Sequence, residues 1–235
     1  MHRLFYFLAV MAFAALGVEE SKEKPNPLLS LERLYGKPEF SAKSYGVKWL
    51  EAGQGYVRLE KSKATKDARD IVRVDPATGK REILVAAKAL IPAGEKKPLA
   101  VSGYTFTKDL AKVLIYTNTR RVWRVHSRGD YWVLDRASGK LRQLGGKEAS
   151  EATLMFAKFS PADSNRVAYV RDKNVYVEDL ATSRIEVLTK RSRDTVINGT
   201  FDWVYEEELG LRDGFRWSPD GKRIAYWQMD EEGVK

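Results

Sequence analysis

The sequence contains no cysteine and only two histidines, His2 and His126. Without cysteine the chain has no disulfides, no thiolate metal ligands and no thiol nucleophile. A Gly-x-Ser-x-Gly nucleophile elbow is also absent, and His2 lies at the start of an apolar segment, so this chain alone cannot assemble a Ser-His-Asp triad. His-Glu-x-x-His spacing and phosphate-binding glycine loops are missing too. The sequence therefore indicates no catalytic residues, no metal and no cofactor.

Apolar runs long enough to cross a membrane are also missing. His2 and Arg3 precede an apolar run from Leu4 to Leu16, which ends in small residues up to Gly17. This order is typical of a secretory signal peptide, here residues 1–17, and the run is short for a bilayer span. We expect a secreted or periplasmic protein, with an uncleaved N-terminal membrane anchor as the alternative.

Clustered basic charge is absent as well, although the net charge is +9, with 41 Lys and Arg against 32 Asp and Glu. The basic residues stand in small separate groups such as Lys61-Ser62-Lys63 and Arg120-Arg121. A continuous basic stripe is the usual footprint of nucleic-acid binding. The distribution favours basic turns on a protein surface and no nucleic-acid partner.

Short runs of β-branched and aromatic residues, bounded by polar turns, fill most of the chain and predict strands. The runs cover residues 57–60, 70–75, 81–85, 113–117, 131–135, 141–144, 166–171, 174–178, 185–188 and 223–227. Trp49, Trp132, Trp217 and Trp227 lie at strand positions and are expected in the core. Asn198-Gly199-Thr200 matches the N-glycosylation pattern, a short motif that often occurs by chance.

Two patterns repeat among these strands. Asp-x-x-x-Gly-Lys, or a close variant, recurs at residues 75–80, 135–140 and 179–184, each time between two predicted strands. Its Asp can cap a hairpin turn and its Gly supplies a positive φ, so Ser183, which replaces Gly in the third copy, is expected to be strained. An aromatic residue followed by a polar turn recurs at Phe106, Phe159 and Trp217, 53 and 58 residues apart. Trp49 marks an earlier, degenerate copy.

Repeats of roughly fifty residues with several strands each are typical of β-propeller blades. We therefore predict an all-β fold: an incomplete β-propeller of about three blades and the start of another. In a propeller, the radial repetition of blades protects the edges of the sheets. The propeller portion covers residues 46–235 and follows the signal peptide and a linker, residues 18–45, with a short helix within 29–35. Since so few blades do not close a ring, we expect the chain to be the N-terminal part of a longer protein.

The most unusual stretch is Asp202 to Gly210, which contains three adjacent glutamates, Glu206, Glu207 and Glu208. One interpretation is a short solvated helix, with Asp202 as N-cap and a left-handed Gly210 at its end. The other is a cation clamp, because two carboxylates can pair with a protonated α-amino group through charge-assisted hydrogen bonds.

Asp202-Trp-Val-Tyr-Glu-Glu-Glu208, followed by Phe215-Arg-Trp-Ser-Pro-Asp-Gly-Lys-Arg-Ile-Ala-Tyr226, resembles the double-Glu segment of the dipeptidyl peptidase IV family. The resemblance implies that Glu207 and Glu208 bind the terminal ammonium of a peptide, and that Glu206 matches the preceding Glu. A shift of one residue makes the pair Glu206 and Glu207 instead. Trp123-Arg124 is similar to an aromatic-Arg pair of the family. This likeness implies that Arg124 faces the carbonyl of the substrate's second residue and braces the carboxylates.

Val125 departs from the family's pattern at this point, and the alternative for Arg124 is an exposed arginine on a basic hairpin. For the whole protein, the resemblance implies a secreted serine exopeptidase that releases Xaa-Pro or Xaa-Ala dipeptides from peptides with a free N-terminus. It also implies a C-terminal α/β-hydrolase domain, missing from this chain, and a protein that can form a homodimer. Two other functions stay open: a non-catalytic periplasmic β-propeller that binds proteins, and a glycoside hydrolase, for which adjacent carboxylates are poorly placed.

Overall fold

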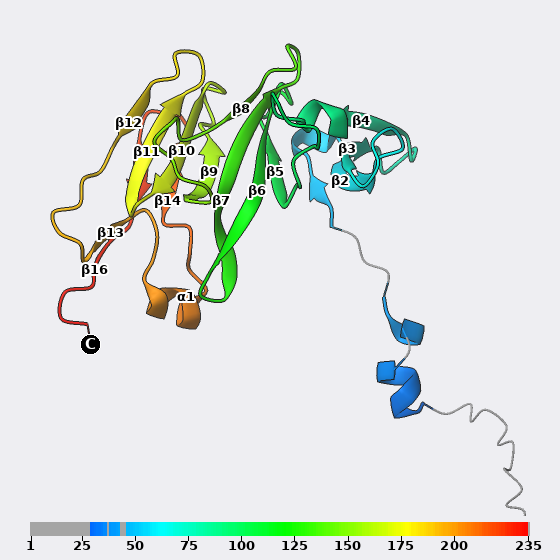
Figure 1. The fold of residues 1–235 in the computed structure, drawn as a ribbon, viewed down its shortest axis with the longest axis horizontal. Coiled ribbons are helices and arrows are strands. Elements are labelled where there is room, and N and C mark those ends of the chain that lie inside the picture. Colours follow the sequence, from blue (N-terminus) through cyan, green and yellow to red (C-terminus); the bar gives the residue numbers. More distant parts are fainter. Residues whose placement is uncertain (1–28, 37, 43–45, 235) are drawn as a thin grey trace, which may run out of the picture. The chain divides into compact units, whose positions relative to one another are not determined.

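A computed structural model describes residues 29–36, 38–42 and 46–234 (Figure 1). The chain divides into two compact units, Met1–Ser44 and Tyr45–Lys235. The first unit contains a π-helix (η1, Glu32–Gly36), which overlaps the segment 29–35 where a short helix is predicted, and a 3-10 helix (η2, Pro38–Phe40). The predicted signal peptide, residues 1–17, lies outside the described residues. None of the helices in the described part of the chain has the length and apolar composition that a bilayer span requires.

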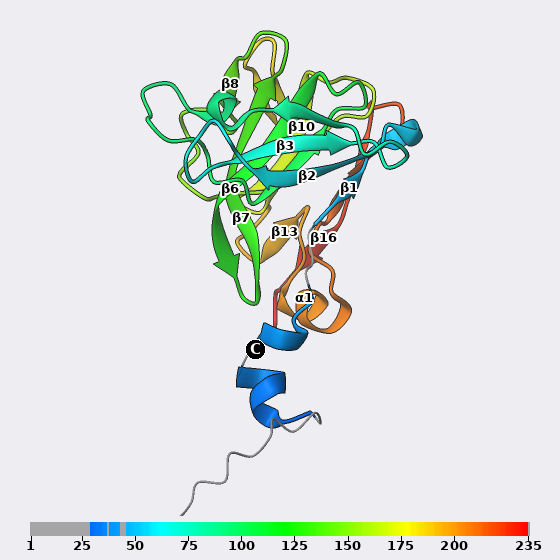
Figure 2. The same ribbon diagram turned by 90° about the vertical axis from the view of Figure 1, so that its right-hand side faces the viewer.

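The second unit consists of antiparallel strands and a few short helices (Figures 1 and 2). Its helices are η3 (Glu51–Gly53), η4 (Ala87–Leu90) and α1 (Trp203–Leu209). Its strands are β1 (Lys48–Trp49), β2 (Tyr56–Lys61), β3 (Arg69–Val74), β4 (Arg81–Val85), β5 (Gly103–Phe106), β6 (Lys112–Val122), β7 (Val125–Asp135), β8 (Leu141–Gln143), β9 (Leu154–Phe159), β10 (Arg166–Arg171), β11 (Asn174–Asp179), β12 (Ile185–Val187), β13 (Val196–Asn198), β14 (Phe215–Trp217), β15 (Ile224–Tyr226) and β16 (Gln228–Asp230). The predicted all-β class is confirmed.

The strands follow one another as antiparallel meanders. Strands β1 to β4 form a four-stranded sheet in chain order. Strands β5 to β8 and β9 to β12 each repeat that order, and a short pairing of β7 with β9 joins them into one eight-stranded sheet. Strands β14 and β15 start a further hairpin, and β13 pairs with β16. This radial succession of meanders is the arrangement of propeller blades, while the number of blades stays a prediction.

Both sequence repeats fall at equivalent turns of these meanders. The aromatic pattern joins β5 to β6, β9 to β10 and β14 to β15, whereas the Asp pattern joins β3 to β4, β7 to β8 and β11 to β12. Each turn aspartate accepts backbone hydrogen bonds as predicted: Asp75 from the Ala77 amide (2.8 Å), Asp135 from Ser138 (2.9 Å) and Asp179 from Thr182 (2.8 Å). The expected positive φ is present at Gly79 (69°), Gly139 (70°) and Ser183 (64°). Ser183 therefore occupies the strained position that glycine fills in the other copies.

The core lies between successive meanders, because the central strands are buried on both faces. Along β6, Val113 and Ile115 pack against residues of the first sheet, and Leu114 packs against residues of β9 to β11. Successive side chains of a strand point to opposite faces, so β6 contacts both neighbouring meanders at once. A third cluster joins β10 and β11 to Phe215 of β14. Stacking on both faces fixes the meanders against one another.

Two expectations about individual residues need correction. Trp132 and Trp217 are partly buried, but Trp49 is 69% and Trp227 is 60% exposed, so the prediction that all four tryptophans lie in the core is wrong. Trp49 lies on β1, one of the two edge strands of its sheet, where no further described strand pairs with it on the outer side. Asn198 of the glycosylation pattern is fully buried and accepts a hydrogen bond from Gln228 (2.8 Å). A buried, hydrogen-bonded amide is not available for glycosylation.

Candidate functional site

The three glutamates lie on helix α1, whose ends are formed as the sequence predicts. The Asp202 side chain accepts a hydrogen bond from the Tyr205 amide (2.9 Å), which satisfies one free donor of the first turn. Gly210 is left-handed (φ 65°), and the Leu211 amide donates to the Tyr205 carbonyl (3.1 Å) and ends the helix. An α-helix has about 3.6 residues per turn, so three consecutive glutamates project in three different directions. They cannot all have the same surroundings.

The burial of the three side chains shows this difference. Glu206 is 4% exposed, and its carboxylate lies 3.2 Å from Arg212 Nε, an ion pair without hydrogen-bond geometry. The Glu207 side chain is 11% exposed, and Glu208 is exposed. Because Glu206 and Glu208 project to nearly opposite sides of the helix, any pair that shares one ligand must include Glu207.

The long hairpin of β6 and β7 brings the predicted arginine to this helix. The two strands run well beyond the predicted residues 113–117 and 131–135, and they end at the Val122–Val125 pair. Trp123 and Arg124 form the tip, with Trp123 at a φ of 49°. Figures 1 and 2 show this tip beside α1.

Arg124 and Glu207 meet there in an ion pair between Nε and Oε2. The Arg124 side chain is itself 73% exposed, so the alternative description of an exposed arginine on a basic hairpin is also correct. A fork-shaped guanidinium beside adjacent carboxylates offsets their mutual repulsion. The structure thus brings together two of the four predicted site residues, places Glu208 at the surface next to them and turns Glu206 inward.

The loop that carries α1 is fastened to the sheets at its base. Thr200 and Asp213 form a β-bridge, and the buried Phe201 stacks on Tyr205 with ring centroids 5.7 Å apart. Lys158 of β9 pairs with Asp213 at 2.6 Å and donates to the Phe215 carbonyl (3.0 Å). Burial lowers the pKa of Lys158, and the contact with Asp213 opposes that shift. These contacts hold the helix at a fixed place opposite the hairpin tip.

A cavity of about 300 Å³ lies between the hairpin, α1 and the β10–β11 turn. Trp123 and Arg128 line it from the hairpin, Glu206 from the helix, and Lys173 from the turn. The cavity therefore adjoins the Arg124–Glu207 pair and mixes apolar walls with charged groups. That combination is typical of a ligand pocket.

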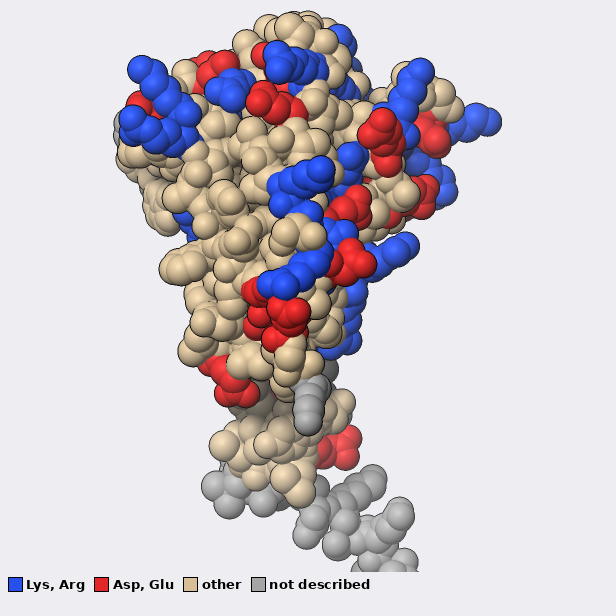
Figure 3. Space-filling view, turned by 90° about the vertical axis from the view of Figure 1, so that its left-hand side faces the viewer, with Lys and Arg blue, Asp and Glu red and all other residues tan. Residues whose placement is uncertain are grey.

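Basic and acidic side chains are mixed on one face of the molecule (Figure 3). Figure 3 shows Lys and Arg beside Asp and Glu on the face that it displays, rather than one continuous basic area. Within residues 29–36, 38–42 and 46–234, no group of three or more His, Asp or Glu side chains is placed to hold a metal ion.

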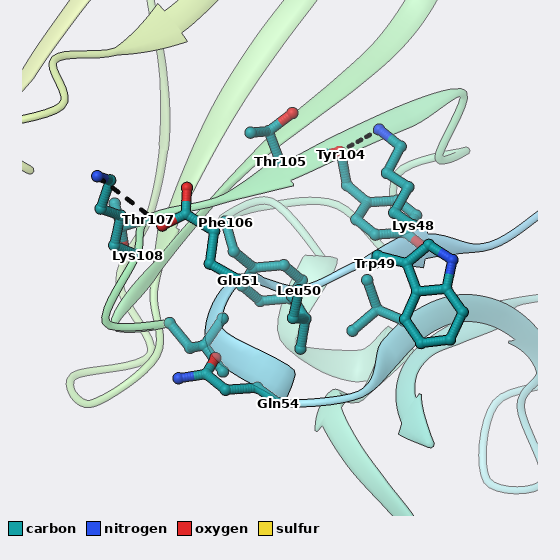
Figure 4. A pocket seen from close by; sticks show the side chains of 12 residues that line it. Lys48, Trp49, Leu50, Glu51, Gln54, Tyr104, Thr105, Phe106, Thr107 and Lys108 are labelled. Atoms are coloured by element: carbon teal, nitrogen blue, oxygen red, sulfur yellow. Dashed lines mark hydrogen bonds and ion pairs between the residues drawn. The ribbon is translucent and has the colours of Figure 1, made fainter. Parts of the chain in front are cut away.

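A second cavity, of about 210 Å³, lies between the segment from Lys48 to Gln54 and strand β5 (Figure 4). Lys48 Nζ donates to the Tyr104 carbonyl (2.6 Å), and burial lowers the pKa of this lysine. Lys108 Nζ lies 3.8 Å from Glu51. Since these charged groups already have partners and the other walls are largely apolar, this cavity offers less to orient a charged ligand than the one beside α1.

The sequence did not reveal two features of the site. Arg212, the partner of Glu206, stands outside the helix and shows no helical spacing to it. Nothing in the sequence sets Arg128 apart from the other basic residues of the hairpin, yet it lines the cavity. Alternation along β7 is the only local signal for the face to which the Arg128 side chain points. The register shift of the β6–β7 ladder between Arg120 and Arg121 obscures that signal.

Residues 107–235, more than half of the chain, match the family model described as the dipeptidyl peptidase IV (DPP IV) N-terminal region. The chain is 30% identical over 210 residues to dipeptidyl peptidase 4 of Trichophyton tonsurans, covering 89% of this chain and 25% of that protein. It is 32% identical over 206 residues to the probable dipeptidyl-aminopeptidase B of Neurospora crassa, covering 83% of this chain and 22% of the relative.

The crystal structure of Porphyromonas gingivalis dipeptidyl peptidase 4 superposes with a TM-score of 0.72 at 25% identity, over 89% of this chain and 29% of that one. This likeness confirms the predicted propeller fold. The chain spans about a quarter of the length of the curated relatives it matches. The chain belongs to the dipeptidyl peptidase IV family, of which it represents the N-terminal region.

Proposed function

We propose that this chain is the substrate-positioning part of a secreted dipeptidyl peptidase IV-like serine exopeptidase. Glu207 and Glu208 hold the free N-terminal ammonium of a peptide, and Arg124 keeps Glu207 in place. A hydrolase domain on further polypeptide cuts after the second residue and releases Xaa-Pro or Xaa-Ala dipeptides. Dimer formation belongs to the same proposal.

The observation that carries this proposal is the Arg124–Glu207 ion pair. The two residues are far apart in the sequence, match separate motifs of the family, and meet at the hairpin tip. A simple solvated helix end needs Asp202 and Gly210 but neither Arg124 nor Glu207. The contact therefore favours a built anionic site over a helix cap alone.

Burial supports Glu207 and Glu208 as the pair. Glu206 already has Arg212 beside it and is shielded from solvent, whereas Glu208 is exposed and has no ion pair in the described part of the chain. Glu207 contributes one carboxylate whose charge Arg124 only partly offsets. Glu207 and Glu208 are neighbours on the helix, and their two carboxylates can accept the N–H donors of an ammonium placed between them through charge-assisted hydrogen bonds.

The test uses the full-length protein and the substrate Ala-Pro-4-nitroanilide. Glu207 is largely shielded, and removing one partner of a charged pair in such a site costs roughly 3 kcal/mol, so Glu207→Ala is expected to lower kcat/KM by about a hundredfold or more. Glu208 is exposed, so Glu208→Ala is expected to lower kcat/KM by a smaller factor. Glu148→Ala serves as the control, because this glutamate is 89% exposed and lies outside the site. Parental turnover by both site variants would refute the assignment.

A further inference from the structure

One charged group that lines the cavity beside α1 has no ion-pair partner in the described part of the chain. Its lining includes three acidic residues, and each lies near a cation. Glu206 is 3.2 Å from Arg212, Glu231 is 3.3 Å from Lys173, and Asp172 is 3.8 Å from Arg171. Arg128 lines the same cavity, and no ion pair joins it to any of the described residues. Arg128 is therefore the unpaired cation of the cavity lining.

A second arginine lies directly opposite Arg128 on the hairpin. The ladder of β6 and β7 pairs Arg120 with Arg128, and Arg120 also has no ion-pair partner among the described residues. Residues directly opposite in an antiparallel ladder share one face, with Cβ atoms about 5 Å apart. Like charges at such positions repel each other, which an anion placed between them relieves. Two guanidiniums at this spacing can bind one carboxylate.

The direction of this face is set by the residues beside it. Val122 and Arg128 both line the cavity, so the face that carries Arg120 and Arg128 is directed towards it. Arg121 directly follows Arg120 on β6, so by alternation along that strand its side chain points to the opposite face, although the ladder shifts register at this step. The same hairpin thus carries an exposed arginine that is directed away from the cavity and serves as a matched control.

We infer that Arg120 and Arg128 form a subsite for a carboxylate side chain on the first residue of the peptide. This inference rests on the proposed function. Glu206 lines the cavity, and Glu207, the next residue, belongs to the proposed ammonium clamp. The side chain of the residue that bears the ammonium branches one bond from that nitrogen, so it is the part of the peptide nearest to the cavity. The preferred substrates are peptides that begin with Glu or Asp before the Pro or Ala.

The test measures the ratio of kcat/KM for Glu-Pro-4-nitroanilide to that for Gln-Pro-4-nitroanilide, with full-length protein at neutral pH. The two substrates have nearly the same shape and differ in charge, and the ratio does not depend on how much of a variant is folded. Partly exposed charge-assisted contacts predict a preference of about three- to tenfold for Glu-Pro in the parent protein. Arg128→Gln is expected to bring the ratio close to one and Arg120→Gln to lower it, while Arg121→Gln keeps the parental ratio.

Charge reversal adds a second readout. Arg128→Glu is expected to prefer Lys-Pro-4-nitroanilide to the Gln-Pro substrate, which a merely structural role for Arg128 does not predict. A parental ratio near one, or an equal ratio in the parent and Arg128→Gln, overturns the subsite while the exopeptidase function stands. Failure of the full-length parent to release 4-nitroaniline from any of these substrates overturns the proposed function itself, and the subsite with it.

Discussion

Ser183 gives a direct test of how the repeated turn is built. In the β11–β12 turn it holds the left-handed position that Gly79 and Gly139 hold in the other two copies. An L-residue in this conformation costs about 1–2 kcal/mol, whereas glycine costs about 0.5–1 kcal/mol more backbone entropy on folding. Ser183→Gly is therefore expected to stabilise the chain by roughly 0.5–1 kcal/mol, a rise in melting temperature of about 1–4 °C for this size.

The reciprocal changes, Gly79→Ser and Gly139→Ser, are expected to lower the melting temperature. A Cβ atom at either glycine meets no atom within 4 Å, so only backbone strain opposes the side chain. Ser192→Gly is the control: Ser192 is exposed and not left-handed, so this change should destabilise through entropy alone. Thermal unfolding followed by circular dichroism measures all four variants. Equal effects of Ser183→Gly and Ser192→Gly would refute the strain argument.

Three further outcomes follow from the structure. Gly129→Ala places a Cβ 2.3 Å from the Tyr116 ring and is expected to cost about 1–3 kcal/mol in urea unfolding; an unchanged midpoint contradicts this. Arg124→Ala leaves the largely buried Glu207 without its cation, so we expect about a tenfold lower kcat/KM on free-amine dipeptides, and unchanged kinetics contradict the bracing role. A hydrogen bond from the Thr182 amide lowers the pKa of Asp179 in the folded chain. At pH values between this lowered pKa and the pKa of about 4 in the unfolded chain, the unfolded chain binds more protons than the folded one. Stability is therefore lost as pH falls through this range, and melting curves at pH 5.5 and 3 should differ less for Asp179→Asn than for the parent.

The fold was largely predictable because its determinants are local. The Asp-x-x-x-Gly pattern specifies a turn through its own hydrogen bonds and one positive φ, and the structure has that turn at all three places. The limits of α1 were predictable for the same reason, since Asp202 and Gly210 act within one helical turn. The far half of the β6–β7 hairpin was not predicted, because Asn118 to Arg121 is polar and lacks the alternation that marks a half-buried strand.

The site was predictable only in part. Family resemblance supplied Arg124 and Glu207, and their contact depends on two elements meeting in space, which no local pattern reports. Three identical glutamates carry no local signal for which of them faces inward; the rotation of α1 on Phe201 and the position of Arg212 decide that Glu206 does. The exposed Trp49 shows the same limit, because alternation along a strand does not show whether another element covers it.

The most direct test of the amine clamp is a crystal structure of the full-length protein with a bound dipeptide. The proposal predicts that the ammonium nitrogen lies about 3 Å from a carboxylate oxygen of Glu207 and of Glu208, within ordinary hydrogen-bond distance, with Arg124 still paired to Glu207. An ammonium bound elsewhere, with both carboxylates facing solvent, contradicts it.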